Sequence, residues 1–302
     1  MFGLVETALL PPRPVWARLR AALTREDARA VVRARLWGTE VARVRVAYVL
    51  TGGAVGAAGA HMGAPLHGAL TGGAAGAAAN RRRADRALAA LARAAPGGVV
   101  LPRGFPDGDL LPRHGLWAWT QAPLCRRVAD RLTVLAADML RVELARLRVA
   151  IVAARVTEDV AGAAAALCGG GRARFLSVSA GRFGAGLCRT LRHRFGVAAL
   201  ADPTPEQLKE TDVYLVFDAP AGGAHLPVRA GAAVLLLGGG RVRTPPGSLV
   251  LRGAAFSPPG RLAADWPPGC DNGALLAALA AAGALSPAEV RIDRLLPAAG
   301  EE

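Results

Sequence analysis

The chain has 302 residues, which suits one large domain or two of ordinary size. Its hydrophobic share of 52% excludes a mainly disordered protein, and its formal net charge of +14 raises the question of a phosphate-bearing partner. Widely spaced cysteines with no CxxC pair support neither a metal site nor a disulfide framework, and they favour reduced thiols in a cytoplasmic protein: Cys125, Cys168, Cys188 and Cys270.

The positive charge lies almost entirely in the first half of the chain. Residues 1–150 hold 22 arginines against ten acidic residues, and Lys209 is the only lysine of the protein, a bias typical of a GC-rich genome. A basic surface suits nucleic acid or anionic lipid, but a solvated basic face explains it equally well. Without interleaved aromatic residues or a recognition motif, nucleic-acid binding is the least favoured of these interpretations.

The N-terminal region, residues 1–146, is predicted to be a basic helical region. Pro11, Pro12 and Pro14 interrupt its start, which lacks the basic and apolar stretches of a secretory signal. Residues 15–46 are interpreted as helix, with Thr24 and Asp27 as a capping pair.

An uncharged stretch rich in glycine and alanine follows at residues 46–80. Small residues recur in it at four-residue spacing, which lets helices approach closely. Three interpretations stay open: a hairpin in or on a membrane, a soluble glycine zipper that packs or self-associates, and a glycine-rich loop. Arginines on both flanks would keep both ends of a membrane hairpin in the cytoplasm.

The next segments are predicted from their periodicity. Residues 80–95 indicate a solvated amphipathic helix, and a loop rich in proline and glycine leads to Trp117 and Trp119 in an extended edge. Residues 125–147 carry apolar side chains at helical spacing and predict one long helix leading into a second domain.

Residues 147–302 are predicted to form an α/β domain with a Rossmann-like, mostly parallel sheet. Apolar runs alternate there with short helical segments, which is typical of βαβ units. A helix is expected at GALLAALAAAGAL and a last strand at VRIDRLL, closing the sheet. The predicted strands are 148–154, 174–180, 197–202, 212–220, 232–240 and 248–254.

The phrases LKETDVYLVFDAP and RAGAAVLLLGGG carry a family resemblance. Over about 90 residues, from 148 to 240, the chain resembles the NAD(P)-binding domains of the shikimate dehydrogenase and glutamyl-tRNA reductase kind. The resemblance implies a Rossmann-like fold with NAD or NADP as cofactor. It implies no catalytic residues, because residues 1–147 show nothing like the substrate domain of those families.

Two turns compete for the phosphates of such a cofactor. The first turn, Ala153–Asp159, holds no glycine and places Glu158 and Asp159 at a helix start, where their charges repel anions. If this turn is the phosphate-binding one, Arg182 follows the second strand and would meet the 2′-phosphate of NADP. In the second frame Gly181, Gly184 and Gly186 form a GxxGxG loop, and Asp202, 21 positions after Gly181, would accept the ribose hydroxyls. The alternative is that these glycines only make tight turns.

Asp218, at the end of the fourth strand, is the remaining candidate, with His225 seven residues later. Open α/β sheets bind ligands beyond the carboxyl ends of their strands, although Asp218 would serve equally to cap a turn. Lys209 and His193 are interpreted as solvated, and the cysteines as buried or incidental thiols.

Two functions from different classes follow. The chain is interpreted first as a non-catalytic binding, interaction or membrane-associated scaffold with an eroded cofactor loop. The alternative is an NAD(P)-binding, oxidoreductase-like enzyme that uses Gly181, Arg182, Gly184, Gly186, Asp202 and Asp218. Whether the protein is an enzyme stays open at this point.

Overall fold

The computed structural model describes residues 1–10, 31–49, 74–218, 224–238 and 241–298. It divides into two compact units, each built from two stretches of the chain. Unit 1 comprises Met1–Thr120 and Pro258–Ser286, and unit 2 comprises Gln121–Ser257 and Pro287–Glu302. The predicted single boundary at 146–147 differs from this division, in which the chain passes from unit 1 to unit 2 after Thr120, returns to unit 1 at Pro258 and enters unit 2 again at Pro287.

Unit 1 contains a five-stranded sheet in the order β2-β3-β1-β4-β5. The pairs β1 with β3, β1 with β4 and β4 with β5 are parallel, and the edge strand β2 is antiparallel to β3. The strands are β1 (Phe2–Leu10), β2 (Val32–Leu36), β3 (Thr39–Val49), β4 (Gly98–Val100) and β5 (Trp117–Ala118). The helical segments are α2 (Ala74–Ala94), the 3₁₀ helix η1 (Gly108–His114), α8 (Gly260–Ala263) and α9 (Asn272–Ala281).

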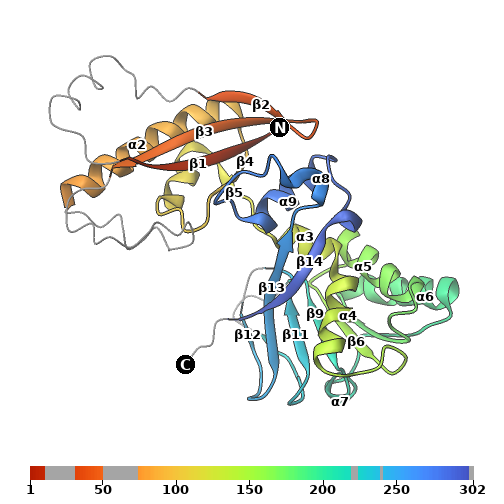
Figure 1. Ribbon diagram of the computed structural model, residues 1–302. Helices are drawn as coiled ribbons and strands as arrows, with labels where there is room; N and C mark the ends of the chain where they lie inside the picture. Colours follow the sequence, from red (N-terminus) through yellow and green to blue (C-terminus); the bar gives the residue numbers. More distant parts are fainter. Residues whose placement is uncertain (11–30, 50–73, 219–223, 239–240, 299–302) are drawn as a thin grey trace, which may run out of the picture. The chain divides into compact units, whose positions relative to one another are not determined.

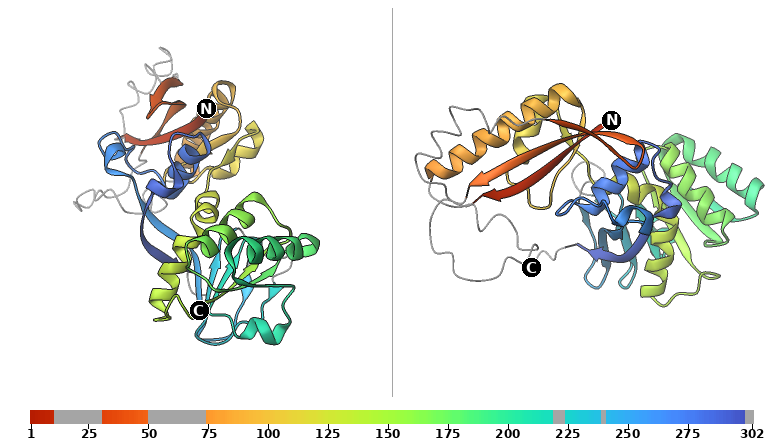
Figure 2. Two further views of the ribbon diagram at one scale, coloured as in Figure 1. Left: turned by 90° about the vertical axis from the view of Figure 1, so that its right-hand side faces the viewer. Right: turned by 45° about the horizontal axis from the view of Figure 1, so that its top comes forward.

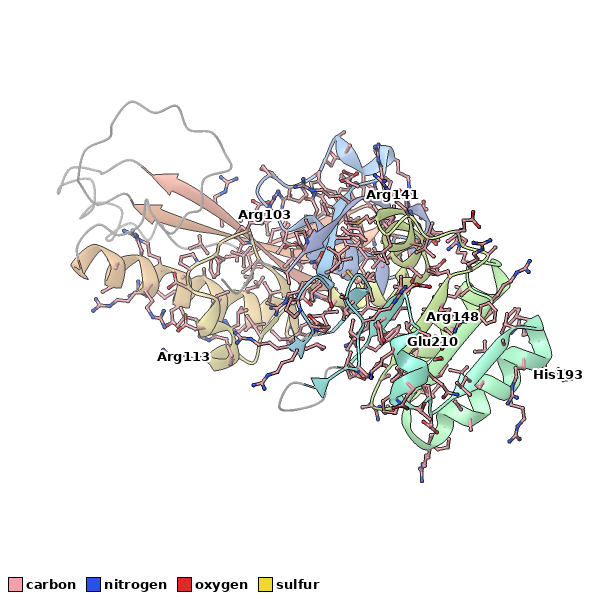
Figure 3. The ribbon with its side chains drawn as sticks, turned by 90° about the horizontal axis from the view of Figure 1, so that it is seen from below. Arg103, Arg113, Arg141, Arg148, His193 and Glu210 are labelled. Carbon is pink, nitrogen blue, oxygen red and sulfur yellow. The ribbon has the colours of Figure 1, made fainter. Side chains whose placement is uncertain are left out.

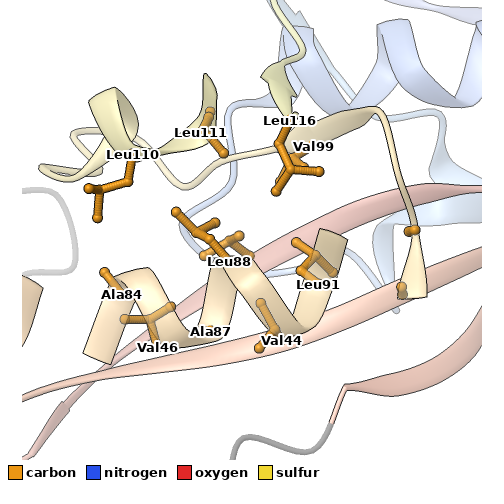
Figure 4. Packing of buried hydrophobic residues seen from close by; sticks show 13 residues of the cluster. Val44, Val46, Ala84, Ala87, Leu88, Leu91, Val99, Leu110, Leu111 and Leu116 are labelled. Atoms are coloured by element: carbon orange, nitrogen blue, oxygen red, sulfur yellow. The ribbon is translucent and has the colours of Figure 1, made fainter. Parts of the chain in front are cut away.

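One face of this sheet forms a core with α2 and the segment around η1 (Figure 4). Val44 and Val46 of β3 meet Leu88 and Leu91 of α2, and all four side chains are buried. These contacts arise because alternate strand residues share one face, while helix residues three or four apart share one side. Leu110, Leu111 and Leu116 cover the other side of α2.

The prediction of a helix over residues 15–46 is wrong in the part that the structure describes. Residues 32–36 and 39–49 are strands. In RVRVAYV charged and apolar residues alternate, and a period of two suits a half-buried strand because one face can stay wet while the other packs. The helix predicted at residues 80–95 is confirmed within α2, and so are the strand at Trp117 and the helix at α9.

Most of the predicted hairpin, residues 50–73, lies outside the described residues. Its flanks are described: β3 ends at Val49 and α2 begins at Ala74. Within the described ranges, no helix has the length and apolar character that crossing a membrane requires.

Unit 2 contains a seven-stranded sheet in the order β14-β13-β11-β9-β6-β7-β8 (Figure 1). All neighbouring strands are parallel except the pair of β13 and β14. The strands are β6 (Arg148–Val152), β7 (Phe175–Ser179), β8 (Ala198–Ala201), β9 (Val213–Val216), β11 (Ala233–Leu236), β13 (Leu249–Ser257) and β14 (Arg291–Pro297). Numbered from β6, the parallel strands run 3-2-1-4-5-6, the Rossmann order.

The α/β fold class and the strands predicted from residue 148 onward are therefore confirmed. The central strands β6, β9 and β11 are apolar runs that are almost entirely buried, which makes them recognisable from the sequence alone. VRIDRLL forms β14 and closes one edge of the sheet. The long helix predicted over 125–147 is instead two short helices, α3 (Ala122–Arg127) and α4 (Ala129–Met139).

Helices α3 and α4 pack with α5 (Glu158–Gly169), and α5 packs with α6 (Gly184–Phe195), beside the sheet (Figure 2). The other face has a thinner cover. Leu208 of the five-residue α7 (Pro205–Lys209) packs there with Leu226 and Val228 against the sheet. The remaining short elements are the 3₁₀ helices η2 (Gly181–Phe183) and η3 (Pro287–Glu289) and the paired strands β10 (Ala224–His225) and β12 (Val242–Arg243).

Candidate functional site

The candidate site lies at the carboxyl ends of β6 and β9. The chain runs from β6 outward to β7 and β8 on one side, and from β9 outward to β11 and β13 on the other. The two halves of the sheet thus diverge between β6 and β9. In open α/β sheets a ligand binds at this divergence, the switch point, because the connections after the two strands leave in opposite directions.

The turn after β6 is poorly suited to phosphate. Thr157 caps α5, its hydroxyl accepting a hydrogen bond from the backbone N–H of Val160 at 3.3 Å. Glu158 and Asp159 occupy the first helical turn, as predicted. Their carboxylates stabilise the positive end of the helix dipole, and the same charges repel a pyrophosphate there.

Arg126 of α3 spans the ends of β9 and β11. Its Nη2 donates to the carbonyl oxygen of Phe217 at 3.2 Å, and its Nε donates to that of Leu237 at 3.3 Å. The same Nη2 lies 3.6 Å from a carboxylate oxygen of Asp218. The side chains of Arg126 and Asp218 are 31% and 42% exposed, so both remain accessible to a ligand.

Gly238 makes room for this arrangement. A Cβ at Gly238 would stand 2.2 Å from the carbonyl oxygen of Phe217 and 2.9 Å from Nη2 of Arg126. Arg126 was not among the predicted site residues, because one arginine on a basic helix looks like its neighbours. The glycine run at the end of β11 was the available signal, since a glycine at a strand end often marks a close backbone approach.

The glycines singled out from the sequence follow β7. Gly181 has φ +62°, a left-handed conformation that favours glycine, and a Cβ there would lie 3.1 Å from the carbonyl oxygen of Ala154. Gly184 is the first residue of α6. Among the described residues nothing lies within 4 Å of a Cβ built at Gly186, so packing does not require glycine at that position. Exposed Arg182 lies over the ring of Phe183, 4.6 Å from its centroid.

The predicted site residues divide between three strand ends. Asp202 is exposed and follows β8 with φ 46°, and Asp218 follows β9. With strands about 4.8 Å apart, Asp218 stands roughly 10 Å from the end of β7 and roughly 14 Å from that of β8. The β7–α6 turn and Asp202 are neighbours, whereas Asp218 belongs with Arg126 at the switch point.

The other candidate side chains are dispersed. His193 lies exposed on α6, and Lys209 is the exposed last residue of α7, as expected for solvated groups. His225 lies in β10, and its side chain is outside the described part of the chain. The described residues contain no group of three histidine, cysteine or acidic side chains that could hold a metal ion.

All four cysteines are buried thiols, and none of them forms a disulfide. Burial raises the pKa of Cys168 to about 11 and that of Cys270 to about 12. Burial also raises the pKa of Cys188. These thiols therefore stay protonated at neutral pH, and the thiolate is the reactive form.

We expect the folded protein to react with dithionitrobenzoate at about pH 8 far more slowly than free cysteine, whose pKa is about 8.5. Unfolding in urea should release all four thiols. Absorbance of the released thionitrobenzoate measures both rates. A folded-state thiol that reacts as fast as free cysteine would contradict the burial described here.

Comparisons with known proteins add likenesses of structure only. No protein-family model matches the chain, and no curated protein sequence matches it. Among solved structures, the D-isomer-specific 2-hydroxyacid dehydrogenase of Lactobacillus delbrueckii ssp. bulgaricus, in its NAD-complexed form, is 12% identical with a TM-score of 0.28. That alignment covers 66% of this chain and 59% of the dehydrogenase.

Two further dehydrogenases give similar values. The D-mandelate dehydrogenase of Rhodotorula graminis is 14% identical, with a TM-score of 0.28 and coverage of 64% of this chain and 59% of that one. The D-lactate dehydrogenase of Salmonella is 12% identical, with a TM-score of 0.30 and coverage of 78% and 70%. The chain thus spans 59% of the first two structures. At these values no activity or residue role is transferred, and the Rossmann-like fold rests on the strand order.

Proposed function

We propose that unit 2 binds a nicotinamide dinucleotide, NAD or NADP, across the carboxyl ends of β6 and β9, as part of an oxidoreductase-like enzyme. The observation that carries the proposal is the Rossmann strand order, with its divergence between β6 and β9. Partly exposed polar groups stand beside that point, at the ends of β9 and β11: Asp218 and Arg126. The substrate stays open.

The residues suit the 2′-phosphate of such a cofactor better than they suit its pyrophosphate. Arg182 follows β7, the second strand of the order, where a cationic side chain would pair with a 2′-phosphate and favour NADP over NAD. At the start of α5, Glu158 and Asp159 oppose the pyrophosphate. We therefore expect weak binding and derive no catalytic step through the cofactor.

A thermal-shift titration with NAD and NADP tests this proposal. A ligand that binds only the folded state adds about 2.7 kcal/mol at a hundredfold excess over its Kd. We expect Glu158→Gln with Asp159→Asn to tighten binding about tenfold by removing repulsion at the helix start. Glu206→Gln, which changes an acid in the first turn of α7, is the matched control and should leave the affinity unchanged.

Four further substitutions locate the cofactor. Asp218→Ala and Arg182→Gln should weaken NADP binding if the ligand lies at the switch point. Loss of binding in Asp202→Ala and Gly184→Val alone would move the site to the β7–α6 turn. The proposal would be contradicted if millimolar NAD and NADP left the melting temperature unchanged in both the wild type and the Glu158→Gln, Asp159→Asn variant.

The second candidate function is a non-catalytic, cytoplasmic scaffold that associates with a membrane or with itself through residues 46–80. The turn Ala153–Asp159 favours it, because that turn has no glycine and bears two acids where phosphates would bind. Replacing residues 51–72 by a Gly-Ser linker of equal length keeps β3 and α2 intact. Vesicle sedimentation and self-association should then be lost, without any change in nucleotide response.

A further inference from the structure

A basic hollow lies at the amino ends of β6 and β9, the opposite end of the sheet from the switch point. Its volume is about 490 Å³. Besides Val142, charged side chains line it: Arg146, Arg148, Lys209, Glu210, Asp212 and Arg229. Figure 3 shows Arg148 and Glu210 side by side, and their side chains form an ion pair.

Two of these cations are held in place by carboxylates. Asp212 is nearly buried; one of its oxygens contacts Arg229 and the other accepts the backbone N–H of Arg148 at 2.9 Å. Arg229 also donates from Nε to the carbonyl oxygen of Thr211 at 3.4 Å. Arg148 pairs with Glu210 and lies over the ring of Phe175, 5.4 Å from its centroid. Both guanidinium groups are about half exposed and keep donors available to a ligand.

The positive charges of the remaining two cations, Arg146 and Lys209, are only weakly compensated by nearby carboxylates. Arg146 approaches Glu143 at 3.7 Å, but both side chains are at least 75% exposed, and such surface pairs contribute little. Lys209 ends α7 and is exposed. Four cations thus face the hollow against two carboxylates that are already paired. Like charges gathered around one concavity repel each other, and an anion bound among them relieves that repulsion.

We propose that the basic hollow binds a small soluble ligand that carries a phosphate or pyrophosphate group. Arginine presents a fork of donors that matches phosphate oxygens, and Lys209 adds a mobile point charge. The volume falls within the range of small-molecule sites, about 300–1,000 Å³. The proposal does not depend on dinucleotide binding, because none of these side chains belongs to the switch point.

Titration calorimetry with inorganic pyrophosphate at low salt tests the proposal on the full chain. We expect saturable binding by the wild type, which weakens as salt rises. Arg146→Gln with Lys209→Gln should weaken binding by about tenfold or more. Both substitutions fall on exposed side chains, and circular dichroism checks that the fold is intact. Lys209→Gln alone should give a smaller loss.

A matched control removes the same charge elsewhere. Arg189→Gln with Arg194→Gln changes two exposed arginines of α6 and should leave pyrophosphate binding unchanged. Arg182→Gln, at the other end of the sheet, should also have no effect, which separates this site from the proposed dinucleotide site. An equal loss in either variant would overturn the proposal, as would no binding by the wild type. Sedimentation with equimolar phosphatidylcholine and phosphatidic acid vesicles, without pyrophosphate binding, would assign the cations to a lipid surface and also overturn it.

Discussion

Gly238→Ala is expected to destabilise unit 2 by about 3 kcal/mol, near the upper end of what overpacking usually costs. The new Cβ would stand 2.2 Å from the carbonyl oxygen of Phe217. That oxygen cannot move freely, because the N–H of Phe217 bonds to Val152 and the N–H of Leu237 bonds to Val216 within the sheet. The strand ends must separate, and Arg126 then loses its acceptors. Urea denaturation followed by far-ultraviolet circular dichroism measures the change.

Gly186→Ala is the matched control for this substitution. Among the described residues nothing lies within 4 Å of a Cβ at Gly186, and the residue sits in the first turn of α6. Alanine there should leave stability unchanged or raise it by about 0.5–1 kcal/mol. Equal urea midpoints for Gly238→Ala and the wild type would show that the carboxyl ends of β9 and β11 are not packed as described.

Asp212→Ala should cost about 2–4 kcal/mol, because it leaves one charged group and one backbone donor without their acceptor. The side chain of Asp212 is only 10% exposed and joins Arg229 to the N–H of Arg148. Asp212→Asn keeps an oxygen for that N–H but removes the charge, so it should fall between the wild type and Asp212→Ala. The same urea titration ranks the three proteins.

Glu210→Ala provides the comparison for Asp212. Glu210 also pairs with an arginine, Arg148, but its side chain is 64% exposed. Water and salt screen such a pair, and its loss should cost less than about 1 kcal/mol. If Glu210→Ala and Asp212→Ala destabilised the protein equally, burial would not be what separates these two ion pairs.

The two ends of the unit 2 sheet offer different chemistry. At the carboxyl ends, Arg126 and Asp218 share the edge of the sheet with the start of α5, where Glu158 and Asp159 repel the pyrophosphate of the proposed dinucleotide. At the amino ends, the basic hollow already carries an excess of positive charge. Measuring NADP and pyrophosphate on the same set of variants therefore distinguishes a failure of one proposal from a failure of the other.

The α/β half of the chain was largely predictable from the sequence. Runs such as VYLV and AVLL are apolar at every position because both faces of a central parallel strand are buried. Thr204 and Gln207 form a capping box at α7, a local signal that needs no tertiary context. Glu158 and Asp159 were likewise placed at a helix start from their position alone, and the structure has them there.

The N-terminal half was harder to predict because its composition is ambiguous. Arginine and alanine favour helix, and this propensity hid the period of two in RVRVAYV, which forms β3. The division into units was also beyond the sequence. The segment Pro258–Ser286 returns to unit 1, and no local pattern says which core an apolar helix such as α9 joins.

The apolar runs of the central strands and the helical character of α5, α6 and α7 could be predicted from the sequence, because these patterns depend on neighbours within a few residues. Only the tertiary structure decided that β6 and β9 lie side by side, that Arg126 reaches the carbonyl oxygens of Phe217 and Leu237, and that Arg148 and Arg229 share Asp212. Arg148 and Asp212 are 64 positions apart in the sequence, and Arg126 and Leu237 are 111 positions apart. Strand order brings such residues together, and a sheet's order is a property of the whole domain rather than of any one segment.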